Sequence, residues 1–325
     1  NLAWDPRYKI VMRAQLNPNK VMLISGGGSG HEPAHAGFVG AGMLDAAVCG
    51  DIFAFPSQVQ VYQALCKTRS QKGTLLIIKN YSGDMMNFKN AAYMAQDDGM
   101  LVDYVKVDDD IAVQDSLYTV GRRGVAGTIF VHKIAGAAAE RGYDLPRVKE
   151  LAQRTAENVK SIGFALTSCT VPAKGTPTFQ LGQDEIEYGV GIHGEPGIRR
   201  ETMCDADTLA NRMIEQILVQ LELDINSSAE IALLVNGLGG TPVQELYVLN
   251  HSVRQVLSKY PKLRVVYSMV GNYMTSIDMA GASISILKLD SELKELLFDA
   301  SDTVAWSMKG YQEPVPYTPL EEDVD

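Results

Sequence analysis

Short apolar runs that end in glycine or polar residues recur through the first half of the chain. Val21–Ile24 leads into Ser25–Pro33, and Thr74–Ile78 leads into Lys79–Asp84. Such compact runs are typical of parallel strands that are covered on both faces. The strands expected here are Val21–Ile24, Thr74–Ile78 and Tyr104–Val107, and the helices are Gln58–Ser70, Phe88–Asp97 and Val125–Arg141. This alternation predicts βαβ units around a mostly parallel sheet flanked by helices.

The pattern changes in the second half. Glu185–His193 alternates between apolar and polar positions, which indicates a strand with one buried face. Thr241–Gln244 has the form of a capping box with proline at the first helical position, so a helix is expected over Val243–Lys259. Further strands are expected at Ile231–Val235, Arg264–Met269 and Ser283–Leu289. This half therefore predicts a mixed sheet with helices.

The order of the expected strands and helices suggests two α/β domains and a tail. A helical pattern over Val148–Val159 gives way to Ile162–Ser168, so we place a boundary near residue 160. We expect an N-terminal domain over 1–160 and a C-terminal domain over 161–311. Residues 312–325 are rich in proline, glutamate and aspartate, which predicts a mobile acidic tail.

Composition excludes several classes of protein. With 46% hydrophobic and 21% charged residues, the chain has ordinary globular usage. A net charge of −10 argues against binding to nucleic acid or to an anionic membrane. No apolar run approaches the ~20 residues of a membrane span. No leader opens the sequence, and the four cysteines form no C-x-x-C pair, so we expect a cytoplasmic protein with reduced thiols.

The segment Ser25–Pro33 is the first candidate for chemistry. Glycines after a strand expose backbone N–H groups that can hold an anion. It is not a Walker A loop, because Gly-Lys-Ser/Thr is missing. It is also a poor dinucleotide fingerprint, because His31–Pro33 interrupts the start of a helix. A tight structural turn is the alternative explanation for the glycines.

Two of the five histidines differ from the others. His31 lies at the mouth of the glycine segment, and His193 opens Gly194–Gly197, so both imidazoles are expected to reach a ligand. His35 could support His31 or serve only the fold. His132 and His251 lie within helical patterns and are expected to be ordinary core or surface residues.

The acidic and basic candidates are more ambiguous. Asp84 follows a buried-looking strand, where it could contact a ligand or cap its own turn. Asp108–Asp110 could hold Mg²⁺, but a solvated turn is the preferred interpretation. Arg122 and Arg123 could bind phosphate, or could lie on the surface or at a subunit contact.

Taken together, these motifs resemble the dihydroxyacetone kinase family, and specifically its ketose-binding K subunit. The resemblance covers the chain from about residue 5 to Trp306. Its main motifs are Ser25–Pro33, Ile77–Asp84, Asp108–Val113, Ser116–Gly127 and Gly189–Gly197. Ordered motifs over the whole chain are far more specific than a single glycine segment.

The resemblance implies a role for each matching position. His193 would add to the ketone carbonyl and hold the substrate as a hemiaminal. His31 would be the proton acceptor beside it, and Asp84 would contact the hydroxyl that is phosphorylated. The other substrate-binding positions that the resemblance implies are Gly28, Ser29, Gly30 and Lys79. No metal ligand and no cofactor is expected on this chain.

The resemblance also implies partners. The chain ends soon after Trp306, where ATP-dependent members continue into a nucleotide-binding domain. We therefore expect the bacterial phosphoenolpyruvate-dependent type, a homodimer that works with an L subunit carrying ADP/ATP and Mg²⁺. A phosphotransferase-system M subunit would recharge that nucleotide.

Two alternatives remain open at this point. Some relatives are non-enzymatic ketose sensors that act on a transcriptional regulator, although the retained Asp84 favours a kinase. The substrate could also be a four-carbon ketose such as erythrulose, because His193 would read only the carbonyl.

Overall fold

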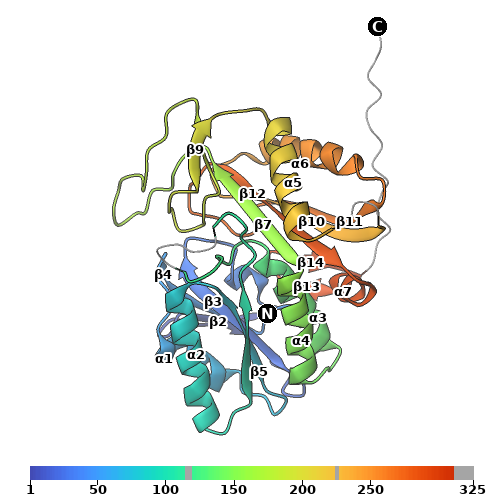
Figure 1. Cartoon of the computed structure of the whole chain (residues 1–325). Helices are drawn as coiled ribbons and strands as arrows, with labels where there is room; N and C mark the ends of the chain where they lie inside the picture. Colours follow the sequence, from blue (N-terminus) through green and yellow to red (C-terminus); the bar gives the residue numbers. More distant parts are fainter. Residues whose placement is uncertain (114–118, 224–226, 311–325) are drawn as a thin grey trace.

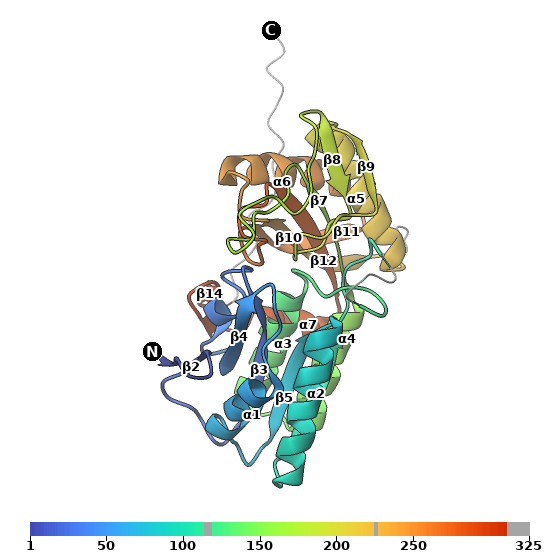
Figure 2. The same cartoon turned by 90° about the vertical axis from the view of Figure 1, so that its left-hand side faces the viewer.

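A computed structural model describes residues 1–113, 119–223 and 227–310. Two six-stranded sheets, each flanked by helices, lie one above the other in Figure 1, and Figure 2 shows the same stacking from the side. The expected α/β class is confirmed. The acidic tail predicted over 312–325 lies outside the described residues.

The first sheet is mostly parallel, as predicted. Its strands, in the order β1-β2-β4-β3-β5-β6, are Leu2–Asp5, Ile10–Arg13, Ala46–Ile52, Met22–Ser29, Thr74–Lys79 and Val102–Val107. The four strands β4-β3-β5-β6 run parallel, whereas β1 and β2 pair antiparallel at one edge.

Helices cover both faces of this sheet (Figures 1 and 2). Helices α1 (Gln58–Lys67) and α2 (Ser82–Asp97) share one core with Ile24. Helices α3 (Thr128–Glu140) and α4 (Leu145–Glu157) share the opposite core with Leu23. Because neighbouring residues of β3 are buried on opposite faces, the strand reads as a continuous apolar run. A short 3-10 helix, Ala36–Phe38, follows β3.

The second sheet is mixed, as predicted. Its strands, in the order β11-β10-β12-β7-β8-β9, are Leu263–Gly271, Ala229–Gly237, Gly281–Leu289, Val159–Ala165, Glu185–Tyr188 and Arg199–Thr202. Only β10 and β11 pair parallel. Helices α5 (Ala206–Gln220) and α6 (Val243–Ser258) pack on one face, while Leu234 on the other face joins the core of α3.

Two local expectations were wrong. The strand expected over Glu185–His193 ends at Tyr188, because Gly189 turns the chain with φ of 76°. The predicted capping box does not form, because the Thr241 hydroxyl instead donates to the Gly281 carbonyl at 2.8 Å. Pro242 takes the N-cap position without a side-chain bond, and α6 begins at Val243.

After β12 the chain returns to the first sheet. Helix α7 (Ser291–Leu297) packs beside α3, and a two-stranded ribbon of β13 (Ser301–Asp302) and β14 (Ser307–Met308) follows it. Trp306, just before β14, meets Phe130 of α3 with ring centroids 6.0 Å apart. Lys133 on α3 donates to the Asp299 carbonyl at 2.7 Å, just after α7 ends. The C-terminal segment therefore ties the two halves together, and the division into two domains at residue 160 stays a prediction.

The close approach of β3 to β4 gives a first test. A Cβ atom on Gly26 would lie 2.2 Å from the Val48 carbonyl oxygen, so Gly26→Ala should force the strands apart. We expect a loss of about 1–3 kcal/mol in the free energy of unfolding, measured by urea denaturation. Gly182→Ala is the control, because that exposed position meets only the flexible end of Glu185. Equal stability of the two variants would contradict the described packing.

Candidate functional site

The candidate site lies where β3 reaches the carboxyl end of the first sheet. Gly26, Gly27 and Gly28 belong to β3 itself rather than to a loop after it, which corrects the sequence prediction. A Cβ atom on Gly27 would lie 3.4 Å from the Lys79 amino nitrogen and 3.8 Å from Asp84 Oδ1. The bare backbone therefore lets two charged groups approach the strand end, where parallel sheets bind ligands.

His31 follows β3 and is fully buried. Its Nδ1 atom lies 2.8 Å from the carbonyl oxygen of Thr275, and its ring stacks on Phe53 with centroids 5.2 Å apart. The backbone N–H of Ile277 donates to the carbonyl of Gly30 at 2.8 Å. The end of β3 is therefore fixed to the segment 275–277 of the second half.

His193 reaches the same place from the second half. Its Nε2 atom lies 3.2 Å from Nε2 of His31, and its ring meets Tyr81 edge-on with centroids 4.4 Å apart. Its backbone N–H donates to Glu195 at 2.8 Å. Its Nδ1 atom is buried and has no hydrogen-bond partner among the described residues. His31 and His193 are 162 positions apart in the sequence, yet their rings are in contact.

The hydrogen bonds define which nitrogens carry protons. A carbonyl oxygen only accepts, so Nδ1 of His31 donates to Thr275. Burial, together with the Lys79 cation, lowers the pKa of His31 well below its usual value, so the ring is neutral and Nε2 keeps a lone pair. Nε2 of His193 must then donate to it, which leaves a lone pair on Nδ1 of His193. Burial and the neighbouring His31 likewise lower the pKa of His193 well below its usual value.

Lys79 and Asp84 complete the polar side of the site. Lys79 ends β5, and burial lowers the pKa of its amino group. Asp84 lies in the first turn of α2, not at the strand end that the sequence suggested, and the helix N-terminus favours a carboxylate there. Burial nevertheless raises the pKa of Asp84 to about 6, against the opposing effect of Lys79.

Several buried polar atoms converge here without a hydrogen-bond partner among the described residues. They are Lys79 Nζ, the Tyr81 hydroxyl, Asp84 Oδ1 and His193 Nδ1. Buried polar groups are nearly always paired in native proteins, so an unpaired set around neutral imidazoles indicates a place for a small polar ligand. Gly28 and Ser29 end the same strand, and Gly30 follows it. The roles of all these residues stay predictions.

Two members of the aspartate triplet, Asp109 and Asp110, are buried and structural in this fold, whereas the solvated turn that we preferred describes only the partly exposed Asp108. Asp109 accepts hydrogen bonds from the backbone N–H groups of Val125 and Gly127, both at 2.8 Å. Asp110 is buried and pairs with Arg123 at 2.7 Å. Across the residues that the structure describes, no three acidic, histidine or cysteine side chains are arranged to hold a metal ion.

Some residues that the sequence singled out as candidates lie outside the histidine site, and the sequence analysis missed some residues that line it. Buried His132 pairs with His35 at 2.9 Å, so His35 supports the core beside the site. Arg123 is buried, which excludes the surface position among the alternatives left open for it, and it contacts the loop of His193. The aromatic ring of Phe53 had no sequence signal, whereas Tyr81 stood within the matched motif Ile77–Asp84.

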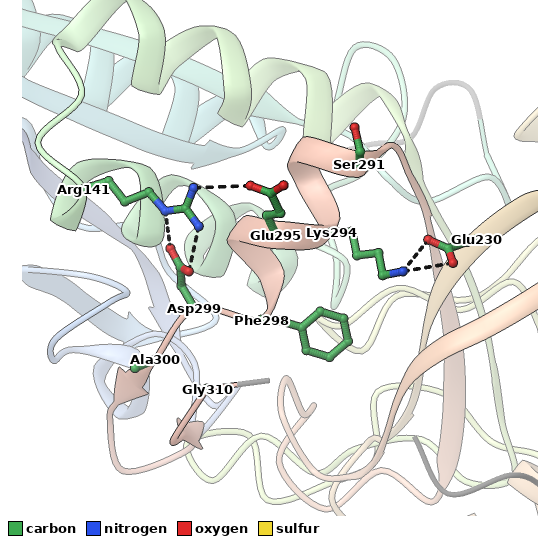
Figure 3. A pocket seen from close by; sticks show the side chains of 9 residues that line it. All are labelled: Arg141, Glu230, Ser291, Lys294, Glu295, Phe298, Asp299, Ala300 and Gly310. Carbon is green, nitrogen blue, oxygen red and sulfur yellow. Dashed lines mark hydrogen bonds and ion pairs between the residues drawn. The ribbon is translucent and has the colours of Figure 1, made fainter. Parts of the chain in front are cut away.

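A pocket of about 560 Å³ lies elsewhere, beside α7 (Figure 3). Arg141 pairs there with Asp299 and Glu295, and Lys294 pairs with Glu230, as the dashed lines show. None of the residues that line it belongs to the histidine site. Its cations are already neutralised by neighbouring carboxylates, so it presents no unpaired charge to a ligand.

The chain is thus an α/β protein with a neutral histidine pair at the carboxyl end of a parallel sheet, which makes this the candidate site for a small ligand. Residues 1–305 match the Dak1 domain, and the chain belongs to that family. It is 50% identical to the PTS-dependent dihydroxyacetone kinase 1, dihydroxyacetone-binding subunit DhaK, of Listeria innocua, covering 92% of this chain and 90% of that one. Against the PEP-dependent DhaK subunit of Escherichia coli the identity is 43%, covering 89% and 86%.

Solved structures agree with this placement. The native dihydroxyacetone kinase of C. freundii superposes with a TM-score of 0.87 at 36% identity, covering all of this chain and 59% of that chain. This chain therefore spans less than two thirds of that kinase. The dihydroxyacetone kinase operon co-activator DhaQ superposes with a TM-score of 0.90 at 36% identity, covering 94% of each chain. In the described part of the chain, no helix combines the length and apolar character of a membrane span.

The raised pKa of Asp84 predicts a pH effect on stability. Because its pKa rises from 3.8 to about 6 on folding, the folded state binds this proton more tightly than the unfolded state. Its contribution is complete below pH 3.8 and is lost as the pH rises through about 6. Asp84→Asn should therefore gain up to about 3 kcal/mol relative to wild type between pH 4 and pH 7, measured by urea denaturation.

The exposed Asp207→Asn variant controls for the loss of one carboxylate. Asp84→Asn and wild-type curves that stay parallel over this pH range would contradict the described burial.

Proposed function

We propose that this chain is the dihydroxyacetone-binding subunit of a phosphoenolpyruvate-dependent dihydroxyacetone kinase, a phosphotransferase. The names of its Listeria innocua and Escherichia coli relatives support this assignment. The observation that carries the chemistry is the 3.2 Å contact between the neutral rings of His31 and His193, which puts a nucleophile beside a base.

The proposed binding step is the addition of the neutral His193 ring to the keto C=O bond. Nδ1, the ring nitrogen with the free lone pair, forms a bond to the keto carbon, and the π electron pair of the carbonyl moves to its oxygen. The ring proton passes to that oxygen, with His31 as the acceptor that relays it. The product is a neutral hemiaminal, so no charge is left in the buried site. Glycerol has no carbonyl and cannot form the adduct, which gives selectivity by bond formation.

Asp84 and Lys79 act on the other end of the bound ketose. Asp84 orients the terminal hydroxyl and accepts its proton late, as the bond to phosphorus forms. The Lys79 cation offsets the negative charge that gathers there. Backbone groups of Gly28, Ser29 and Gly30 line the ketose. An alcohol is far too weak an acid for Asp84 to ionise it beforehand, so positioning is the main contribution.

The phosphoryl donor is proposed to bind elsewhere. An L subunit would carry ADP/ATP and Mg²⁺, and a phosphotransferase-system M subunit would recharge the nucleotide from phosphoenolpyruvate. A solved C. freundii kinase contains AMP-PNP and Mg²⁺, which supports nucleotide use in such a system. A homodimer and a cytoplasmic location are part of the same proposal, and the four free cysteines support a reducing compartment.

The two alternatives differ in what they would do with the ligand. The structural similarity to the co-activator DhaQ is the observation that favours a ketose sensor. A sensor would bind dihydroxyacetone without turnover, and the buried Asp84 beside Lys79 favours a kinase over that role. A four-carbon ketose such as erythrulose would form the same adduct, so relative kcat/KM values for the two sugars decide between them.

Kinase activity tests the assignment. The chain mixed with an ATP-loaded L subunit and dihydroxyacetone should form dihydroxyacetone phosphate, measured in a coupled assay. Asp84→Ala should lower kcat by about 100-fold or more, because it removes the proton acceptor. His193→Ala should abolish the ketose adduct. His251→Ala, an exposed histidine on α6, is the matched control and should keep full activity. A wild-type mixture that forms no dihydroxyacetone phosphate would overturn the kinase assignment, and turnover by Asp84→Ala equal to wild type would refute the proposed role of Asp84.

A further inference from the structure

A buried ion network runs from the first sheet to the loop of His193. The Arg123 guanidinium is buried and pairs with Asp110 at 2.7 Å and with Glu195 at 3.2 Å. Its third contact is the carbonyl oxygen of Gly189 at 2.8 Å. The second carboxylate oxygen of Glu195 accepts the backbone N–H of His193 at 2.8 Å. The network therefore ends on the backbone that carries the nucleophile.

The loop of His193 is built around this network. Residues 189–197 contain no helix or strand, so their backbone is held by specific contacts rather than by a ladder. A Cβ atom on Gly191 would lie 1.8 Å from the Glu195 carboxylate and 2.8 Å from the Arg123 guanidinium. The carboxylate thus lies directly against the loop backbone, in a space that only glycine leaves open.

The same arginine is anchored beside the other half of the site. The Asn80 side chain, next to Lys79, donates to the carbonyl oxygens of Val120 at 3.0 Å and Arg122 at 2.7 Å. A Cβ atom on Gly124 would lie 2.9 Å from Cα of Lys79. The segment 120–124 is therefore packed against the end of β5.

We propose that Arg123 and Glu195 are positioning residues that fix the ring of His193 at the distance where it meets His31, and so set how much ketose is held as the adduct. This inference rests on the proposed function for its substrate. The site needs such a fixed support for the His193 loop because its two histidines come from different halves of the chain. A carboxylate held by the buried Arg123 guanidinium on one oxygen and by a backbone N–H on the other is a stiff support, whereas a free loop would let the ring drift.

Glu195→Gln is the sharpest variant. It keeps the shape and an acceptor oxygen for the His193 N–H, but it removes the charge that holds the loop on Arg123. The control is Asp45→Asn, which breaks another buried ion pair, Lys20–Asp45 at 2.8 Å. Asp45 accepts a hydrogen bond from the backbone N–H of Leu23. Leu23 lies six residues before Ser29, the end of β3 at the site, which is a distance of about 20 Å along the strand. Both variants should lose stability, because each removes one of the two carboxylates beside a buried cation and leaves only the other, Asp110 for Arg123 and Glu140 for Lys20.

The readout is the adduct itself, followed by ¹³C NMR of dihydroxyacetone labelled at its keto carbon. Glu195→Gln should weaken adduct formation about 10-fold, and its KM for the ketose should rise by the same factor while kcat stays within about 2-fold. Asp45→Asn should leave both quantities at the wild-type level. Unchanged adduct formation in Glu195→Gln, or an equal loss in the two variants, would overturn the positioning role.

A second measurement separates this inference from the proposed function. In ¹⁵N-histidine-labelled protein without ketose, Glu195→Gln should shift the ring signals of His193 and His31, whereas Asp45→Asn should not. A wild-type protein that forms no adduct would refute the function, but the ring signals would still test the positioning role. Ring signals that match wild type in Glu195→Gln would refute the positioning role alone.

Discussion

The structure depends on one contact between two rings, Nε2 of His31 against Nε2 of His193 at 3.2 Å. Each ring is held in part by the other half of the chain. The Thr275 carbonyl of the second half fixes His31, and Arg123 of the first half reaches the loop of His193 through Glu195. Each half therefore positions the other half's histidine, and the two rings meet only when both sheets are folded and docked.

Burial keeps this pair neutral. In water an imidazole with a pKa of ~6.5 is partly protonated near neutral pH. In this site the pKa of each ring lies well below that value, and polar atoms of Lys79, Tyr81 and Asp84 have no hydrogen-bond partner in the described part of the chain. Unpaired buried polar groups cost stability, and in the proposed function a small polyhydroxy ketone would pair with them. Hydrogen bonds and a covalent bond would then supply the affinity that so small a ligand cannot gain from apolar burial.

The sequence was informative where local pattern decides structure. Apolar runs of parallel strands are easy to read, and His31, Asp84 and His193 stood out because glycine or a strand end exposed them. It was uninformative where contacts between residues far apart in the sequence decide the local structure. The alternation through His193 hid the turn at Gly189, whose carbonyl oxygen accepts a hydrogen bond from the distant Arg123. The Arg123–Glu195 pair joins positions 72 residues apart, so no local pattern signals it. Likewise, no local pattern signals that the Thr241 hydroxyl donates a hydrogen bond to the distant Gly281 carbonyl instead of capping α6.

The central claim is that His193 forms a covalent bond to the keto carbon, and a crystal structure of the protein soaked in dihydroxyacetone tests it most directly. The account predicts continuous density from a ring nitrogen of His193 to a tetrahedral carbon, with a terminal hydroxyl within hydrogen-bonding distance of Asp84. A planar, unattached ketone in the site, or a ligand bound away from the His31–His193 pair, would contradict it.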